Sequence, residues 1–329
     1  MRTRVSVCFI VLTLLMAALF VLDLCLGQVN ISASDVWASL TGGEVSRVTQ
    51  RIVLNLRLTK AVTAVLAGAA LSLSGLQMQT LFRNPLAGPY VLGISSGASL
   101  GVALFILGAP LMGMSAWMSS LGLAGAAWVG AAAVLALIVA VARRIRDIMV
   151  ILVLGVMFSS GVSAVVQILQ YLSREESLKS FVLWTMGSLG DVTLRQLWIF
   201  VPAVLAGLVL GFAAVKPLNL LLLGEDYART MGLNVGRSRA MIFGSTTLLA
   251  GTATAFCGPI GFIGLAMPHV TRLMLHDSDH RVMVPGTALA GACVMLACDI
   301  ISKMMVLPVN AITALLGVPV VIWIVLRTK

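Results

Sequence analysis

The chain has 329 residues, of which 60% are hydrophobic and 10% are charged, whereas soluble globular proteins average about 45–50% and about 25%. A soluble fold of this length could not bury so much apolar surface. These proportions exclude a separate catalytic domain, a nucleic-acid-binding module and a disordered tail. The net charge of +10 is therefore interpreted by the side of a bilayer on which the basic residues lie.

Apolar runs long enough to cross a bilayer recur along the whole chain. Backbone groups in lipid must be bonded internally, and the runs are too long for barrel strands, so they predict helices. The first run resembles a signal peptide, but Asp23 stands where a small residue should precede cleavage, so we interpret it as a retained span. We predict one all-α integral membrane domain, residues 1–329, with ten transmembrane helices. Their approximate ranges are 5–24, 61–81, 91–109, 121–142, 148–170, 196–215, 240–257, 260–275, 283–301 and 309–326.

The basic residues indicate the orientation of these spans. With a cytoplasmic N-terminus, the inside segments hold 14 of the 22 Lys and Arg and 5 of the 12 Asp and Glu. This excess agrees with the positive-inside rule. We therefore predict that both the N- and C-termini are cytoplasmic. An outer cluster of Arg47, Arg51, Arg57 and Lys60 departs from the rule and requires a separate explanation.

Two hydrophilic segments are longer than turns. The outer segment, 27–60, mixes polar and apolar residues and predicts a short surface helix. The inner segment, 216–239, has helix-forming composition over 220–231 and a glycine stop at Gly232. A shorter outer loop, 171–195, contains an amphipathic patch over 181–189.

Small and polar residues mark two of the spans. Gly93, Gly97 and Gly101 fall four apart and predict a close helix–helix contact, because packing of small residues drives association in lipid. The fifth span carries uncharged hydrogen-bonding residues, for which helix packing and the lining of a pathway are equally open. They are Ser159, Ser160, Ser163, Gln167 and Gln170.

The sequence offers little support for chemistry within the chain. It has no phosphate-binding loop, no CxxC pair and no mid-membrane acidic or basic residue, since Asp23, Asp191 and Asp299 fall near the outer boundaries. We interpret the five cysteines as buried free thiols. The segment from His276 to His280 fits a solvated turn better than a metal site. An ion-coupled secondary transporter and a membrane-embedded hydrolase that uses its histidines remain as lower-ranked alternatives.

Several separated blocks resemble the FecCD-type permeases, the membrane subunits of ATP-driven importers for iron–siderophore, haem and cobalamin. The resemblance covers the chain from about Leu56 to its end. Its most specific blocks are LAGAALSLSG (66–75), RNPLA (83–87), LGISSGAS (92–99), WTMGSL (184–189), Gly224-Glu225-x-x-Ala228-x-x-x-Gly232, GPIGFIGLAMPHVTR (258–272), DHRVMVPG (279–286) and LGVPVVIW (316–323).

The resemblance implies a type II importer permease with ten helices in two inverted halves. LAGAALSLSG (66–75) and LAGTATAFCG (249–258) lie on spans of opposite direction and agree with such a repeat. The inner segment then holds short helices that couple to an ATPase, with Gly224, Glu225, Ala228 and Gly232 matching the pattern. Arg57, Lys60 and Lys303 match outer basic positions that meet acidic residues of a binding protein. Lysine occupies two of these positions and lacks the bidentate fork of arginine.

The resemblance also implies the rest of the assembly. We expect a homodimer or a close heterodimer in the bacterial inner membrane, two cytoplasmic ATPase subunits and a periplasmic binding protein. This chain is expected to be non-catalytic and to bind no cofactor or metal, because ATP and Mg would be held by the ATPase. The expected cargo is a ferric siderophore or haem, and cobalamin is the alternative.

Overall fold

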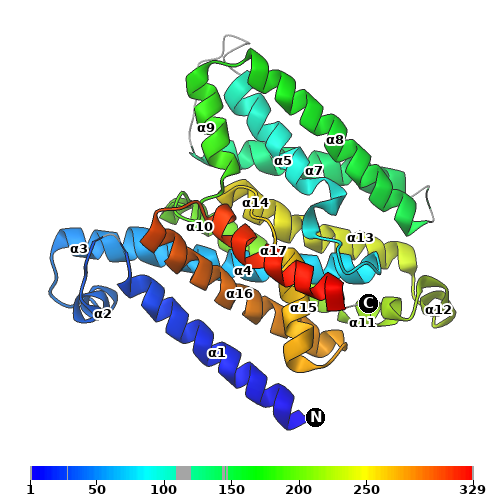
Figure 1. Cartoon of the computed structure of the whole chain (residues 1–329), viewed down its shortest axis with the longest axis horizontal. Coiled ribbons are helices and arrows are strands. Elements are labelled where there is room, and N and C mark those ends of the chain that lie inside the picture. Colours follow the sequence, from blue (N-terminus) through cyan, green and yellow to red (C-terminus); the bar gives the residue numbers. More distant parts are fainter. Residues whose placement is uncertain (1, 28, 109–119, 143–144, 146, 328–329) are drawn as a thin grey trace.

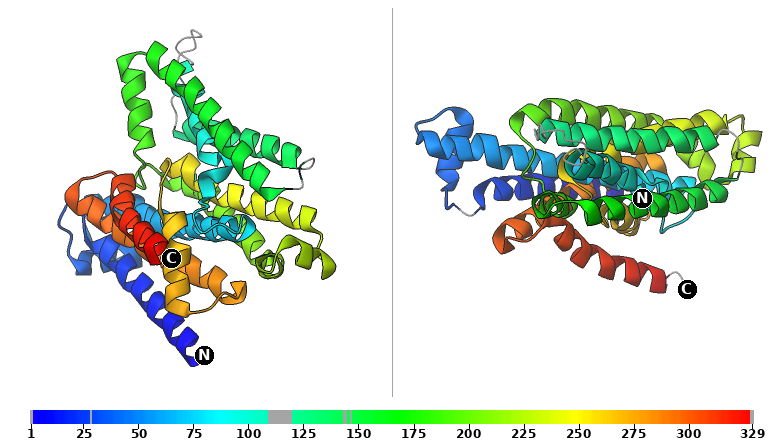
Figure 2. Two further views of the ribbon diagram at one scale, coloured as in Figure 1. Left: turned by 45° about the vertical axis from the view of Figure 1, so that its right-hand side comes forward. Right: turned by 90° about the horizontal axis from the view of Figure 1, so that it is seen from above.

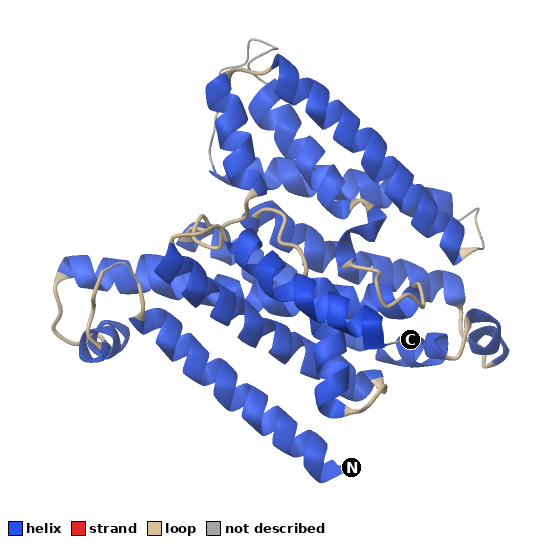
Figure 3. Cartoon of the chain, viewed as in Figure 1, coloured by secondary structure: helices blue, strands red, loops and turns tan. Residues whose placement is uncertain are grey.

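A computed structural model describes residues 2–27, 29–108, 120–142, 145 and 147–327. Within these ranges every regular element is a helix (Figure 3). Helices occupy all ten ranges in which spans were predicted, although residue 109, the last of the third range, lies outside the described residues. In the part of the chain that the structure describes, six continuous helices are long and apolar enough to cross a membrane. The count of ten spans therefore stays a prediction, while a multi-pass helical membrane protein is confirmed.

The first half of the chain begins with a long helix and an outer hairpin. α1 (Arg2–Cys25) leads to the short α2 (Ala33–Thr41) and α3 (Arg47–Arg51). A wide helical turn, η1 (Ile52–Arg57), joins α3 to α4 (Leu58–Leu81) without a break. The segment 27–60, for which a short surface helix was predicted, therefore holds two short helices and the first turns of this long helix. The apolar run determines which part of this helix is buried but does not limit where the helix begins.

Four helices on one side of α4 form a separate layer (Figures 1 and 2). The third predicted span consists of η2 (Pro89–Leu92), α5 (Ile94–Ala103) and η3 (Leu104–Gly108). α7 (Ser120–Ala142), α8 (Ile148–Leu172) and the outer helix α9 (Glu175–Thr185) follow. α9 overlaps the amphipathic patch that was predicted from the sequence.

The remaining helices surround α4. They are α10 (Leu194–Ala213), α11 (Val215–Leu222), α12 (Glu225–Thr230), α13 (Val235–Thr246), η4 (Thr247–Gly251), α14 (Thr252–Cys257), α15 (Ile263–Leu275), α16 (His280–Met305) and α17 (Val309–Arg327). The chain turns sharply between α14 and α15, where Gly258 has φ +75° and Phe262 has φ +66°.

α4 is the centre of the molecule. Nearly all of its residues from Ala61 to Leu81 are buried, as expected of a helix that is apolar on every face. α10, α13, α15 and α16 all contact it. Small residues permit this close packing, since a Cβ added to Gly75 would overlap the carbonyl of Gly264 on α15.

Candidate functional site

The predicted coupling segment lies at one end of the molecule (Figure 1). The segment, for which the composition predicts helix over 220–231 and the resemblance implies short helices, forms two short helices, α11 and α12, because Gly224 between them has φ +107°. The leucine residues of this segment favour a continuous helix. The positive φ of Gly224, which glycine adopts without a steric cost, interrupts that helix. The segment therefore changes direction at Gly224 and presents α12 at the end of the protein.

The other three residues of the coupling pattern fix α12 in place. Glu225 in its first turn pairs with Arg239 of α13, with 2.9 Å between Arg239 Nε and Glu225 Oε1. The helix ends in a Schellman motif, in which Gly232 (φ +83°) donates to Arg229 O and Leu233 N donates to Ala228 O, both at 3.0 Å. Ala228 is fully buried. The pattern thus describes a short helix that is anchored at both ends.

The exposed surface of this coupling segment carries three large apolar side chains among charged and polar ones. Leu223, Tyr227 and Met231 are exposed by 62%, 50% and 59%. Large apolar side chains that lie together beside charged residues are typical of protein–protein contact surfaces. Together with the anchoring of α12, they make a rigid surface that could receive a partner at this end.

The three predicted docking residues gather at the opposite end, where α1, α4 and α16 meet. Lys303 Nζ lies 2.8 Å from Asp23 Oδ1 and 2.9 Å from Asp299 Oδ2, and Lys60 Nζ lies 3.0 Å from Asp299 Oδ1. Both carboxylates are fully buried. Buried charges need partners of opposite sign, so these four residues form a neutral cluster that holds the three helices together at this end.

Arg57 is bound differently from the two lysines. Its guanidinium Nη1 donates to the carbonyls of Leu24 and Cys25, each at 2.8 Å, and Nη2 donates to Val29 O. Arg57 therefore satisfies backbone acceptors at and just beyond the C-terminal end of α1. It is 6% exposed. Of the three residues, Lys60 is the most accessible, with 22% of its side chain exposed. The docking role stays a prediction.

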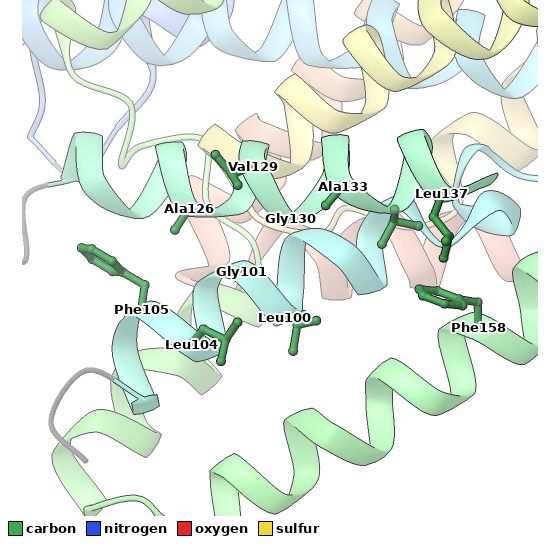
Figure 4. Close-up of a pocket in the computed structure, with 11 residues that line it drawn as sticks. Leu100, Gly101, Leu104, Phe105, Ala126, Val129, Gly130, Ala133, Leu137 and Phe158 are labelled. Carbon is green, nitrogen blue, oxygen red and sulfur yellow. The ribbon is translucent and has the colours of Figure 1, made fainter. Parts of the chain in front are cut away.

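The polar residues of the fifth span lie along α8. Ser160, Ser163 and Gln167 are exposed, whereas Ser159 and Gln170 are partly buried. At 3.6 residues per turn these five residues share one side of α8, and Phe158 points away from it. Phe158 instead lines an apolar groove of about 710 Å³ between α5, α7 and α8 (Figure 4). The polar stripe therefore faces outward from the subunit, and its role in lining a pathway stays a prediction.

The three glycines predicted to form a helix contact, Gly93, Gly97 and Gly101, have two different roles. A Cβ added to Gly97 or Gly101 would collide with the α7 backbone at Gly130 or Ala126. These two glycines thus lie in a direct contact between helices. Gly93 is instead the left-handed residue that precedes α5, with φ +71°.

Sequence reasoning missed the partners of several of these groups. His280 was interpreted as part of a solvated turn, but it is 1% exposed and lies between Thr80 and Asn219, each 2.8 Å from a ring nitrogen. The interpretation was wrong because His280 is the first residue of α16 and faces α4. His269 contacts Pro85 O at 2.8 Å. Among the described residues, no group of three or more His, Cys, Asp or Glu could hold a metal ion.

The fold and the two ends define a class: a multi-pass helical membrane protein whose buried central helix joins a charged end to an anchored, apolar end. The model of the FecCD transport family matches residues 14–327. The chain belongs to this family.

Named relatives cover nearly the whole chain. It is 35% identical over its full length to a hemin transport system permease protein of Yersinia pestis, with 97% of that protein covered. It is 38% identical over 97% of its length to a vitamin B12 import system permease protein of Klebsiella pneumoniae, with 93% covered. A solved structure described as an inward-facing conformation of a metal-chelate type ABC transporter matches with a TM-score of 0.85 and 30% identity, covering 98% of this chain and 99% of that one.

Proposed function

We propose that the chain is the non-catalytic permease subunit of an ATP-driven importer that carries an iron chelate, a ferric siderophore or haem, from the periplasm to the cytoplasm. The observation that carries the proposal is the anchored coupling segment. Its helix is fixed through Glu225 and Gly232, and its exposed surface includes large apolar side chains. Such a helix can transmit a rigid displacement from an ATPase, which a flexible loop could not.

Two copies of this chain would enclose the pathway. The exposed polar stripe on α8 has uncharged groups, including Ser160 and Gln167, that can contact a chelate without ligating its metal. A strong ligand set would retain the cargo instead of releasing it. Two ATPase subunits, which hold ATP and Mg, and a periplasmic binding protein would complete the assembly in the bacterial inner membrane.

Docking of the binding protein would occur at the end that carries Lys60 and Lys303. Complementary charge accelerates association and fixes orientation more than it adds affinity. The intramolecular pairs with Asp23 and Asp299 mean that an incoming carboxylate would share or replace existing partners.

Cobalamin is the second candidate cargo, and the 38% identity to a vitamin B12 permease favours it. A direct test is ATP-dependent uptake in proteoliposomes that contain the permease, its ATPase and its binding protein, with haemin and cobalamin supplied separately. We expect haemin uptake that requires all components and hydrolysable ATP. Uptake of cobalamin alone would change the cargo, and uphill uptake by the permease alone would contradict the proposal.

The coupling role is tested in the same vesicles. Glu225→Arg combined with Gly232→Pro removes both anchors of α12 and should abolish uptake while ATP hydrolysis continues. Arg281→Gln, an exposed change at the same end of the molecule, is the control. Unchanged transport by the double variant would contradict the coupling assignment.

A further inference from the structure

One continuous helix connects the two ends of this protein. It runs from Arg47 to Leu81 through the centre of the fold. Its outer part carries Arg57 and Lys60, and its last turn carries Thr80. In Figure 1 this helix extends from the end with α2 and α3 towards the end with α11 and α12. A displacement of its last turn would therefore also displace Lys60, which pairs with Asp299 at the other end of the helix.

A chain of hydrogen bonds, buried at Thr80 and His280 and partly exposed at Asn219, joins this last turn to α11. Thr80 Oγ1 lies 2.8 Å from His280 Nε2, and His280 Nδ1 lies 2.8 Å from Asn219 Oδ1. Asn219 Nδ2 donates to Asp279 Oδ1 at 2.6 Å. Three elements that are far apart in sequence, α4, α11 and the start of α16, are thus connected through one imidazole ring.

The partners determine the direction of each bond. Asn219 must place its amide nitrogen on the Asp279 carboxylate and its oxygen on the backbone N–H of His280, which donates at 2.8 Å. The ring nitrogen beside that oxygen must then carry a hydrogen, so the neutral ring is protonated on Nδ1. Nε2 of the neutral ring then faces the hydroxyl of Thr80, whose single hydrogen lies between Nε2 at 2.8 Å and Leu76 O at 2.9 Å.

This chain of hydrogen bonds includes a residue of the coupling segment itself. Asn219 is on α11, which ends two residues before Gly224, and α11 is held against the fold by the buried Leu218 and Leu221. Apolar contacts alone permit sliding, whereas a directed chain of hydrogen bonds fixes register. His280 and Thr80 are 1% and 4% exposed, so water does not compete for the bond between them.

We propose that Asn219, His280 and Thr80 are positioning residues that transmit the movement of the coupling segment to α4, and through α4 to the outer end where the binding protein would dock. The proposal rests on the proposed importer function. It predicts that breaking either bond of the His280 ring weakens communication between the binding protein and the ATPase, because α11 and α4 are then linked only by apolar packing.

The test uses the complete transporter in proteoliposomes, with the permease, its ATPase and its binding protein. Stimulation of ATP hydrolysis by the binding protein measures communication between the two ends without reference to cargo. Thr80→Val removes the hydroxyl at constant shape, and Thr80→Ser retains it. Asn219→Leu removes the other bond at a partly exposed position, so at least one of the two breaks should leave a folded protein. The control is His276→Asn. His276 is an exposed histidine in the same turn, and asparagine accepts its left-handed conformation.

We expect Thr80→Val and Asn219→Leu each to reduce the stimulation by about threefold to tenfold, at unchanged yield of assembled complex. Thr80→Ser and His276→Asn should match the unmodified protein. Because both bonds belong to one chain, the double variant should be little worse than either single one. Wild-type stimulation in either bond-breaking variant would overturn the proposal, and so would an equal loss in the control. If the binding protein still stimulates ATP hydrolysis but haemin is not taken up, the proposed cargo is wrong and the proposed role of these three residues is unaffected.

Discussion

Glycine positions on the central helix show how single residues determine the packing of this fold. Gly68 lies against the backbone of Gly291 on α16, and Gly75 lies against Gly264 on α15. Helices in lipid associate through packing and hydrogen bonds, because lipid tails are as apolar as the side chains. Each close contact therefore depends on the absence of a Cβ at both partners.

Gly75→Ala should destabilise the protein because the added methyl group would meet the carbonyl of Gly264, and neither backbone can move freely. Overpacking of this kind costs about 1–3 kcal/mol. Thermal unfolding in detergent, followed by size-exclusion chromatography, measures the loss. Gly161→Ala on α8, where nothing lies within 4 Å of the new Cβ, should be neutral. Equal stability of the two variants would contradict the packing argument.

The buried ion pairs of Lys303 are a second case in which one residue determines stability. Lys303 bridges Asp23 and Asp299, and only 10% of its side chain is exposed. Loss of one member of a buried ion pair leaves uncompensated charge, which is more damaging than loss of the whole pair.

Lys303→Met should therefore lower the free energy of unfolding by about 3–5 kcal/mol, because two fully buried carboxylates would retain only Lys60 as a cationic partner. Denaturant titration of the detergent-solubilised protein measures the change. Lys179→Met on α9 removes an exposed lysine and should change stability by less than about 0.5 kcal/mol. A small effect at Lys303 would show that the cluster is not held as a buried ion-pair network.

At the level of single elements, the spacing of glycine and alanine in the inner segment describes the end of α12. Ala228 accepts the outer hydrogen bond of the Schellman motif from Leu233 N, and Gly232 donates the inner one to Arg229 O. The motif needs a left-handed residue just after the end of the helix, which here is Gly232. Glycine adopts that conformation without a steric cost. The family pattern thus has a physical basis in one helix end.

Gly232→Ala should strain this end by about 1–2 kcal/mol and reduce the amount of ATPase that copurifies with the permease, because the apolar side chains of α12 would no longer be held in one orientation. Gly236→Ala, four residues later in α13 at an ordinary helical conformation, is the matched control. If both variants retain the ATPase equally, α12 does not need its glycine-closed end for binding.

Sequence reasoning could place the helices because lipid imposes a long apolar run on each one. It could not place their ends or interruptions. The break at Gly224 and the extension of α4 back to Arg47 depend on backbone conformation and on tertiary packing. The partners of Lys303 and His280 were missed for a related reason: Asp23 and Asn219 are distant in sequence, and no local spacing connects them.

At the level of the whole molecule, the described ends of α1 and α17 lie towards the same side as α12, opposite α2 and α3 (Figure 1). The distribution of basic residues along the sequence independently predicts that this side is cytoplasmic. The outer cluster that departs from the positive-inside rule is partly explained, since Arg57 binds backbone carbonyls and Lys60 binds Asp299. The charge of Lys60 is paired within the fold and that of Arg57 is bound by backbone carbonyls, so neither side chain lies free on the surface.

The orientation can be tested with two single cysteines in right-side-out membrane vesicles. Ser34→Cys lies on α2 at the predicted outer face, and Ser278→Cys lies in the turn between α15 and α16 at the inner face; both positions are exposed. A membrane-impermeant maleimide should label the first cysteine in intact vesicles and the second only after permeabilisation. The native protein, whose five free cysteines are buried or partly buried, provides the background. The reverse pattern would place α12 outside the cell, where no ATPase could reach it, and would contradict the proposed direction of transport.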